Sequence, residues 1–177
     1  MADSYNNRVL IWNTLPNGNE APDIVLGQQD FYTNAPGTGR DNMNWPKSIA
    51  TDGQKVVVTD TYNDRILIWN DFPTENGEPA DIVLQGSDTG TNLRKDNLLW
   101  PWGAWTDGDK LAITSTKQSG VLIWNDFPTR DNQSADLKLT GEGALGTPRQ
   151  ITSDGKSLIV GDHNAKIDGQ RGVGTFF

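Results

Sequence analysis

The sequence predicts an all-β fold, and three observations carry that prediction. Short apolar runs such as VLIW, ILIW, VVV and DIVL recur along the chain and are rich in β-branched and aromatic residues. Gly, Pro, Asn and Asp bound these runs, which is typical of strands. Asp-Gly pairs separate successive apolar runs, and a glycine that tolerates positive φ favours a tight hairpin there. None of the recurring segments favours a helix.

An internal repeat organises these segments. Trp12, Trp69 and Trp124 mark successive copies, so each copy is about 55 residues long. The stretch DSYNNRVLIWN at 3–13 returns as DTYNDRILIWN at 60–70 and, in degraded form, as STKQSGVLIWN at 115–125. Each copy is therefore one supersecondary unit.

Four strands are expected in each copy, in a fixed order. A Pro-led strand with an Asp-Gly turn comes first, a short apolar strand second, the LIWN strand third and a DIVL-type strand fourth. The run at 9–12 is apolar without alternation, which in a strand indicates burial on both faces. The sheets must then stack against one another. The first strands fall within 45–53, 100–108 and 147–155, and the second strands within 55–60, 110–115 and 157–162.

Repeated four-stranded antiparallel sheets of this kind are typical of the blades of a β-propeller. The chain is expected to form one domain over 1–177, with a partial blade at 1–27, complete blades at 45–86 and 100–140, and a partial blade at 147–177. On this count it starts with strands three and four of one blade and ends with strands one, two and part of three of another. These three blade equivalents are fewer than the four to eight blades of typical propellers.

Two chains are therefore expected to close one six-bladed ring as a homodimer. The leading RVLIWN and DIVLG would pair with the trailing QITSD and LIVGD of a second copy under two-fold symmetry, the commonest symmetry of oligomers. Unpaired strand edges would otherwise promote association. The alternatives are a fragment of a longer propeller and a truncated product whose only property is assembly.

The repeat resembles the NHL-type propeller repeat. TDTYNDRILIWN at 59–70 and ADSYNNRVLIWN at 2–13 match its order of an Asp, an N-x-R segment and a hydrophobic third strand, whereas the copy at 115–125 lacks the Asp and the Arg. The segment 162–177 fits as a diverged fourth copy. The resemblance implies a site on the face where the loops from strand four to one and from strand two to three emerge. The NDFPT turns lie on the opposite face and are expected to be structural.

Composition and charge exclude several classes of function. The net charge of -8 opposes binding to nucleic acid, whose affinity depends on Lys and Arg neutralising phosphates. Cysteine is absent, so there is no disulfide and no thiolate metal site. No stretch approaches the roughly 18 apolar residues of a membrane helix, and no leader pattern is found at the N-terminus. The prediction is a soluble, cytoplasmic protein with no nucleic-acid or membrane partner.

Five residues near the start of the first strands are candidates for a ligand pocket. Lys47, Trp102 and Arg149 each follow a proline, and Trp45 and Trp100 each precede one, which favours an extended backbone. The position after the proline varies between repeats, as residues that line a channel do when function differs by blade. The pocket candidates are Trp45, Lys47, Trp100, Trp102 and Arg149.

Other residues have both a functional and a structural interpretation. His163, the only histidine, is a candidate general base or ligand contact, or a loop residue bonded to backbone. Asp3, Asp60 and Asp162 recur at equivalent turns; they could bind calcium through oxygen, but a turn-stabilising role with Arg8 or Arg65 is favoured. Trp12, Trp69 and Trp124 repeat within third strands and are expected to pack in the core.

The leading functional hypothesis is a noncatalytic module that binds a protein, a peptide or a small polar ligand without a cofactor. The alternative is a calcium- or other metal-dependent hydrolase or lyase with its site on the axis, as in some propellers that the repeat resembles. The segments PKSIA, PWGAW and PRQIT supply no carboxylate before their Asp-Gly turns, which favours binding over metal-dependent chemistry.

Overall fold

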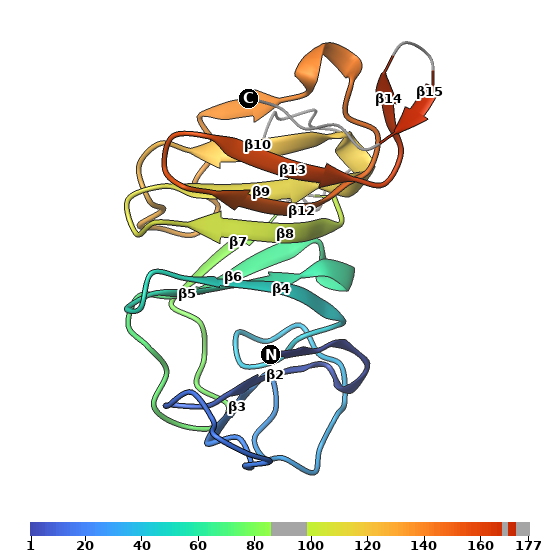
Figure 1. Cartoon of the computed structure of the whole chain (residues 1–177). Helices are drawn as coiled ribbons and strands as arrows, with labels where there is room; N and C mark the ends of the chain where they lie inside the picture. Colours follow the sequence, from blue (N-terminus) through green and yellow to red (C-terminus); the bar gives the residue numbers. More distant parts are fainter. Residues whose placement is uncertain (86–98, 168–169, 173–177) are drawn as a thin grey trace.

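The computed structural model describes residues 1–85, 99–167 and 170–172 (Figure 1). All regular structure in these residues is β-strand or short 3₁₀ turn, which confirms the all-β prediction. No helix in the described part of the chain is long and apolar enough to cross a membrane.

Two four-stranded antiparallel sheets form the middle of the molecule, in the predicted strand order. In both sheets the first two strands are joined through an Asp-Gly turn whose glycine has positive φ, 96° at Gly53 and 93° at Gly108. A 3₁₀ turn joins the second and third strands. The first of these sheets contains β4 (Pro46–Thr51), β5 (Val56–Asp60), β6 (Arg65–Trp69) and β7 (Ile82–Gln85). The second contains β8 (Pro101–Thr106), β9 (Leu111–Ser115), β10 (Gly120–Trp124) and β11 (Leu137–Leu139).

The first sheet of the chain has three strands, β1 (Ala2–Asp3), β2 (Arg8–Ile11) and β3 (Ile24–Leu26). The prediction that the chain starts with only strands three and four of a blade is wrong for this sheet. Asp3 pairs with Arg8 as Asp60 of β5 pairs with Arg65 of β6, so β1 corresponds to the end of a second strand. The main chain of Met1 extends this pairing to Leu10, because the Leu10 N–H donates to the Met1 carbonyl at 2.9 Å.

The last full-length strands are β12 (Pro148–Ser153) and β13 (Leu158–Asp162), which form a two-stranded sheet. A third strand was expected to follow in this sheet. Instead, β14 (Ala165–Ile167) pairs with β15 (Gln170–Gly172) in a separate hairpin, so β14 does not extend β13. Residues 168–169 and 173–177 of the predicted fourth copy lie outside the described residues.

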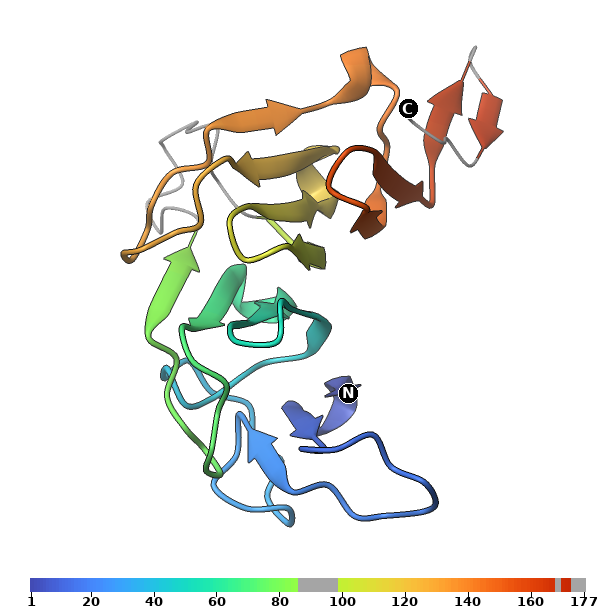
Figure 2. The ribbon, with the colours of Figure 1, turned by 60° about the vertical axis from the view of Figure 1, so that its left-hand side comes forward.

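The first four sheets stack face to face in chain order and follow an open arc, and the hairpin of β14 and β15 stands to one side (Figures 1 and 2). Three apolar layers fill the spaces between successive sheets. Every residue of β5, β6 and β9 is buried, as the runs without alternation predict. Trp69 and Trp124 are each 1% exposed, whereas Trp12, at the end of the stack, is half-buried. Each of these indoles donates its N–H to a backbone carbonyl, of Glu20, Glu78 or Gln133.

The NDFPT loops protect the outer edge of the preceding sheet, a role that the sequence did not reveal. In the loop after β6, the Asn76 side chain accepts the Val25 N–H at 3.0 Å and the Gly77 N–H donates to the Val25 carbonyl at 2.9 Å. In the loop after β10, Asp131 and Asn132 make the same two bonds to Val83 of β7. These bonds satisfy polar backbone groups that an edge strand would otherwise leave open.

Candidate functional site

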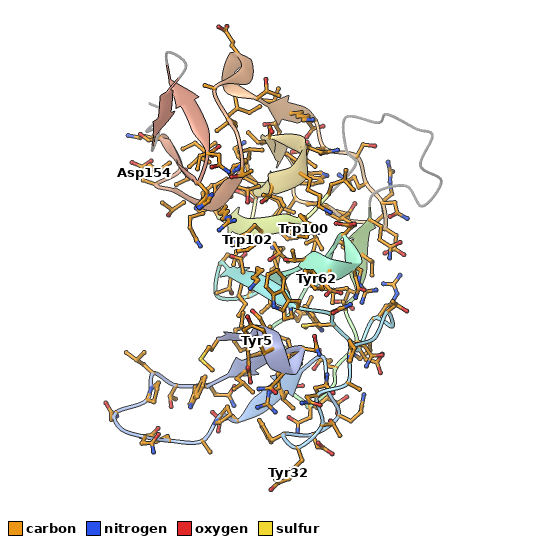
Figure 3. The ribbon with its side chains drawn as sticks, turned by 90° about the vertical axis from the view of Figure 1, so that its right-hand side faces the viewer. Tyr5, Tyr32, Tyr62, Trp100, Trp102 and Asp154 are labelled. Carbon is orange, nitrogen blue, oxygen red and sulfur yellow. The ribbon has the colours of Figure 1, made fainter. Side chains whose placement is uncertain are left out.

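Seven side chains from three neighbouring sheets form one aromatic–cationic cluster, of which Tyr62, Trp100 and Trp102 are labelled in Figure 3. It brings together five of the six residues that the sequence singled out and adds two that it did not. The cluster consists of Trp45, Lys47, Tyr62, Trp100, Trp102, Lys117 and Arg149.

Three members occupy the same position in successive first strands. Lys47, Trp102 and Arg149 are the second residues of β4, β8 and β12, directly after the proline. The pairing of each strand with its neighbour shifts register at this point, so one extra residue is accommodated as a β-bulge. Bulges twist a strand and redirect its side chains. Each of the three sheets therefore presents the side chain that follows its proline at an equivalent place in the bulge.

Buried threonine hydroxyls tie each bulge to the next sheet. Thr59 accepts the Ser48 N–H at 2.8 Å and donates to the Trp102 carbonyl at 3.0 Å. One sheet further along, Thr114 accepts the Gly103 N–H at 2.7 Å and donates to the Arg149 carbonyl at 3.1 Å. A hydroxyl that both accepts and donates can hold two main chains at once. The spacing between cluster residues is set in this way.

A second series of hydroxyl bonds fixes the proline before each bulge. Ser4, Thr61 and Thr116, the first residues of the 3₁₀ turns, donate to the carbonyl oxygens of Pro46, Pro101 and Pro148 at 2.5, 2.6 and 2.7 Å. Each bond again crosses from one sheet to the next. The turn sequences DSYN, DTYN and STKQ therefore position the neighbouring first strand as well as closing a hairpin.

The prediction of extended backbone at Trp45 and Trp100 is wrong, because φ is 56° at Trp45 and 52° at Trp100. Positive φ is rare for a bulky residue. It costs on the order of 1–3 kcal/mol and persists only where other contacts hold the residue in this conformation. Those contacts come from the preceding sheet: the Trp45 N–H donates to the Asn7 side chain at 2.9 Å and the Trp100 N–H to Asp64 at 2.7 Å. The acceptors lie in the left-handed turn residues, far away in sequence.

The rings of the cluster contact one another in a continuous row. Tyr62 lies between Trp45, with centroids 4.4 Å apart and planes tilted by 39°, and Trp100, at 5.9 Å and 26°. Trp45 meets Trp102 edge to face at 5.6 Å and 90°. These spacings are favourable for aromatic pairs. Because Tyr62 is 51% exposed, the row is open to a ligand.

Three cations lie over these rings. The Lys47 ammonium is 3.2 Å from the Trp45 centroid and 5.1 Å from that of Trp102. The Arg149 guanidinium lies over Trp102 at 4.6 Å, and the Lys117 ammonium over Trp100 at 4.3 Å. All four distances are within the range of cation–π attraction.

Burial and the nearby Arg149 charge lower the pKa of Lys47. The Arg149 Nε is buried and has no hydrogen-bond partner among the described residues. The ion pairs of the described residues use Arg8, Arg40, Lys55 and Arg65, none of which belongs to the cluster. The cluster is a locally positive surface on a protein of net charge -8.

Tyr62 and Lys117 are the two members of the cluster that the sequence did not single out. They occupy equivalent places, since each is the middle residue of its 3₁₀ turn, and each contacts the tryptophan before the first strand of its own sheet. Tyr5 is the third residue of this series. Alignment of DSYNN, DTYND and STKQS would have identified the position as variable, as it did for the residue after proline.

His163 lies outside the cluster. It follows β13, is exposed, and its backbone N–H donates to the Thr147 carbonyl at 3.2 Å. Within the described residues its side chain makes no hydrogen bond or ring contact. The position fits the loop interpretation of this histidine.

The repeated aspartates are bonded as structural residues. Asp60 pairs with buried Arg65 at 2.6 Å and accepts the Asn44 N–H at 2.6 Å. Asp3 pairs with Arg8 at 2.8 Å, and Asp162 accepts three backbone N–H groups, from Gly146, Thr147 and Asn164. Across the ranges that the structure describes, no group of three or more His, Cys, Asp or Glu side chains could hold a metal ion.

No model of a known protein family matches the chain, and no curated protein matches it either. The geometry of the cluster is therefore the feature of this protein that points to a function.

Proposed function

We propose that this protein is a noncatalytic binding module whose aromatic–cationic cluster engages a protein, a peptide or a small polar ligand. The observation that carries the proposal is the convergence of Trp45, Trp100 and Trp102, from two sheets, with Lys47 and Arg149 on one accessible surface. Aromatic rings and arginine are the residue types that contribute most to binding energy at interfaces. The seven members include no carboxylate, thiol or imidazole, so nothing in the cluster favours the alternative of a calcium-dependent hydrolase or lyase.

The proposal is tested by screening the purified protein against arrays of peptides and glycans. Every ligand found is then measured with Trp102→Ala and with Tyr32→Ala as a control. Tyr32 is 95% exposed and lies far from the cluster (Figure 3). We expect Trp102→Ala to weaken binding by at least about tenfold and Tyr32→Ala to leave it unchanged. Ligands that bind both variants equally well would place the site elsewhere.

The arc of sheets supports a second proposal, that the fold is part of a β-propeller built from NHL-type repeats. Two adjacent sheets have the same four-strand order, and the same bulge and the same hydroxyl bonds recur from sheet to sheet. Radial repetition of such sheets around a channel defines a propeller. The first strands, and the cluster on them, would then lie nearest the axis.

The ring is proposed to close through a second copy of this chain. In the described residues β13 pairs only with β12, whereas the equivalent β5 and β9 each pair with two strands. The outer strands β3 and β7 are covered by the loop of the next sheet, and β11 has no such cover among the described residues. The loop that would cover it, at 13–20, is fully exposed, with Leu15 at 91%.

The repeat predicts the register of this contact. By analogy with β9 and β10, Ile159 of one copy would lie opposite Ile11 of the other. A cavity of about 370 Å³ lies beside β2 and is lined mainly by apolar side chains, including Leu10, Ile11 and Phe72. However, β1 of the same chain already pairs with Arg8 and Val9. Closure therefore requires β1 to leave this edge, a condition that the sequence did not suggest.

A further inference from the structure

The most unusual feature of the cluster is that two cations share one ring. The Lys47 ammonium and the Arg149 guanidinium lie 5.1 and 4.6 Å from the Trp102 centroid, and they come from the sheets on either side of it. Like charges placed together repel, and repulsion by Arg149 contributes to the lowered pKa of Lys47. Attraction to the ring offsets part of that repulsion.

Neither cation has an acidic partner within the described part of the chain. The ion pairs there use other basic residues, and the buried Arg149 Nε is without a hydrogen-bond acceptor. A buried donor without an acceptor is costly, because it has lost its water. An anion that approached Lys47 and Arg149 would supply the acceptor and relieve the repulsion together.

From this arrangement we infer that Lys47, Trp102 and Arg149 form a subsite for a carboxylate group of the ligand. The inference depends on the proposed binding function and specifies the chemistry of its ligand. A guanidinium presents donors in a planar fork that matches the two oxygens of a carboxylate, and a lysine ammonium adds a point charge. The Trp102 ring beside them provides a flat apolar wall for the atoms that carry the carboxylate.

A phosphate fits this subsite less well. Phosphate sites commonly use several backbone N–H groups that point to one place. At the bulges of β4 and β8 two such groups are already occupied, because the Ser48 N–H bonds to Thr59 and the Gly103 N–H bonds to Thr114. With these two donors occupied, the Arg149 fork and the Lys47 ammonium are the donors that the subsite offers, and the planar fork matches the two oxygens of a carboxylate.

The test uses three probes that share one aromatic ring: benzoate, its neutral isostere benzamide, and phenyl phosphate. Binding is followed by the ¹H–¹⁵N signal of the Trp102 indole, which is assigned with Trp102→Phe. We expect benzoate to shift this signal saturably, benzamide to do so much more weakly, and phenyl phosphate to bind no tighter than benzoate. Benzamide binding as tight as benzoate, tighter binding of phenyl phosphate, or no saturable shift with benzoate would overturn the carboxylate subsite.

Matched variants test the residues. Arg149→Gln and Lys47→Gln each remove one cation, and each is expected to weaken benzoate binding by about tenfold or more, since charge-assisted hydrogen bonds are lost. Lys156→Gln is the control, because Lys156 is exposed in the turn between β12 and β13 and does not belong to the cluster, and it should leave the affinity unchanged. Equal affinity in all three variants would refute the assignment. If Trp102→Ala still abolishes binding of array ligands while benzoate fails to bind, the proposed function stands and the carboxylate subsite does not.

Discussion

The Thr114 hydroxyl lies 3.1 Å from the carbonyl oxygen of Arg149, across the space between two neighbouring sheets. The same hydroxyl accepts the Gly103 N–H within its own sheet. A single oxygen therefore sets the distance between Trp102, next to Gly103, and Arg149. The Trp102 ring and the Arg149 guanidinium, 4.6 Å from its centroid, extend from the two strands that this hydroxyl joins.

Thr114→Val should lower the free energy of unfolding by about 1–3 kcal/mol, because it leaves a backbone N–H and a carbonyl without their partner. Urea denaturation measures the change. Thr129→Val is the control, since Thr129 is exposed and its hydroxyl makes no bond in the described structure. Equal midpoints for the two variants would show that the bond across the sheets contributes nothing.

Gly103→Ala should be destabilising by about 1–3 kcal/mol through overpacking. A methyl group at this position meets the Arg149 carbonyl and the Ile151 side chain. The Trp102 indole signal should also move, because β8 and β12 must separate. The matched control is Gly18→Ala, where an added methyl meets nothing within 4 Å. A stable Gly103→Ala variant with an unchanged indole signal would contradict the close packing of these strands.

Asp60→Asn should cost about 3–5 kcal/mol, because it leaves the buried Arg65 charge without its partner. Asp3→Asn breaks the equivalent pair with Arg8 in the first sheet, where both side chains are partly exposed. Water can solvate Arg8 there, so the loss should be smaller. Thermal denaturation measures the loss of stability in both variants. A larger loss in Asp3→Asn than in Asp60→Asn would disprove the argument from burial.

The pKa of Lys47 should lie below its ordinary value of 10.5 and should rise in Arg149→Gln, which removes the repelling charge. A folded-state pKa below the unfolded one means that the unfolded chain binds more protons between the two values. The contribution of Lys47 to stability therefore increases as the pH rises from the lowered pKa toward 10.5. A ¹³C titration of the lysine ε-carbon measures this pKa, and an unaltered value in Arg149→Gln would argue against coupling.

The solution mass of the chain should be twice that of one copy if the proposed ring closure is correct. Ile159→Asp should then give a monomer, because it places a charge opposite Ile11 in the paired strands. Light scattering after size exclusion provides the mass. Tyr32→Asp adds the same charge at an exposed position outside the expected contact and should leave the mass unchanged. A monomeric wild-type chain would rule out closure by a second copy.

The sequence predicted most strands of the described fold because their signals are local. Pro, Asp-Gly and the apolar runs act within a few residues, and they correctly located β4 to β6 and β8 to β10. The same signals led to the candidate pocket residues, since the position after proline varies between copies. Tyr62 and Lys117 were missed because their role depends on rings that lie in other strands.

The backbone of Trp45 was predicted incorrectly for a physical reason. The residue before proline prefers an extended backbone, yet the Asn7 side chain accepts the Trp45 N–H and holds φ at 56°. The two residues are 38 positions apart. Similarly, the first sheet has one strand more than expected. This strand, β1, forms only because residues 1–3 fold back and pair with Arg8 and Val9.

The sequence by itself determined the all-β class, the repeat and the order of strands in the two middle sheets. Each segment has its own β-strand propensity and its own pattern of apolar residues, and both act over short range. Only the tertiary structure decided that Lys47, Trp102 and Arg149 meet over one ring. That meeting depends on bulges in three strands and on the hydroxyls of Thr59 and Thr114, which bond across sheets. Such bonds join residues that are far apart in the chain, and no local pattern encodes their geometry.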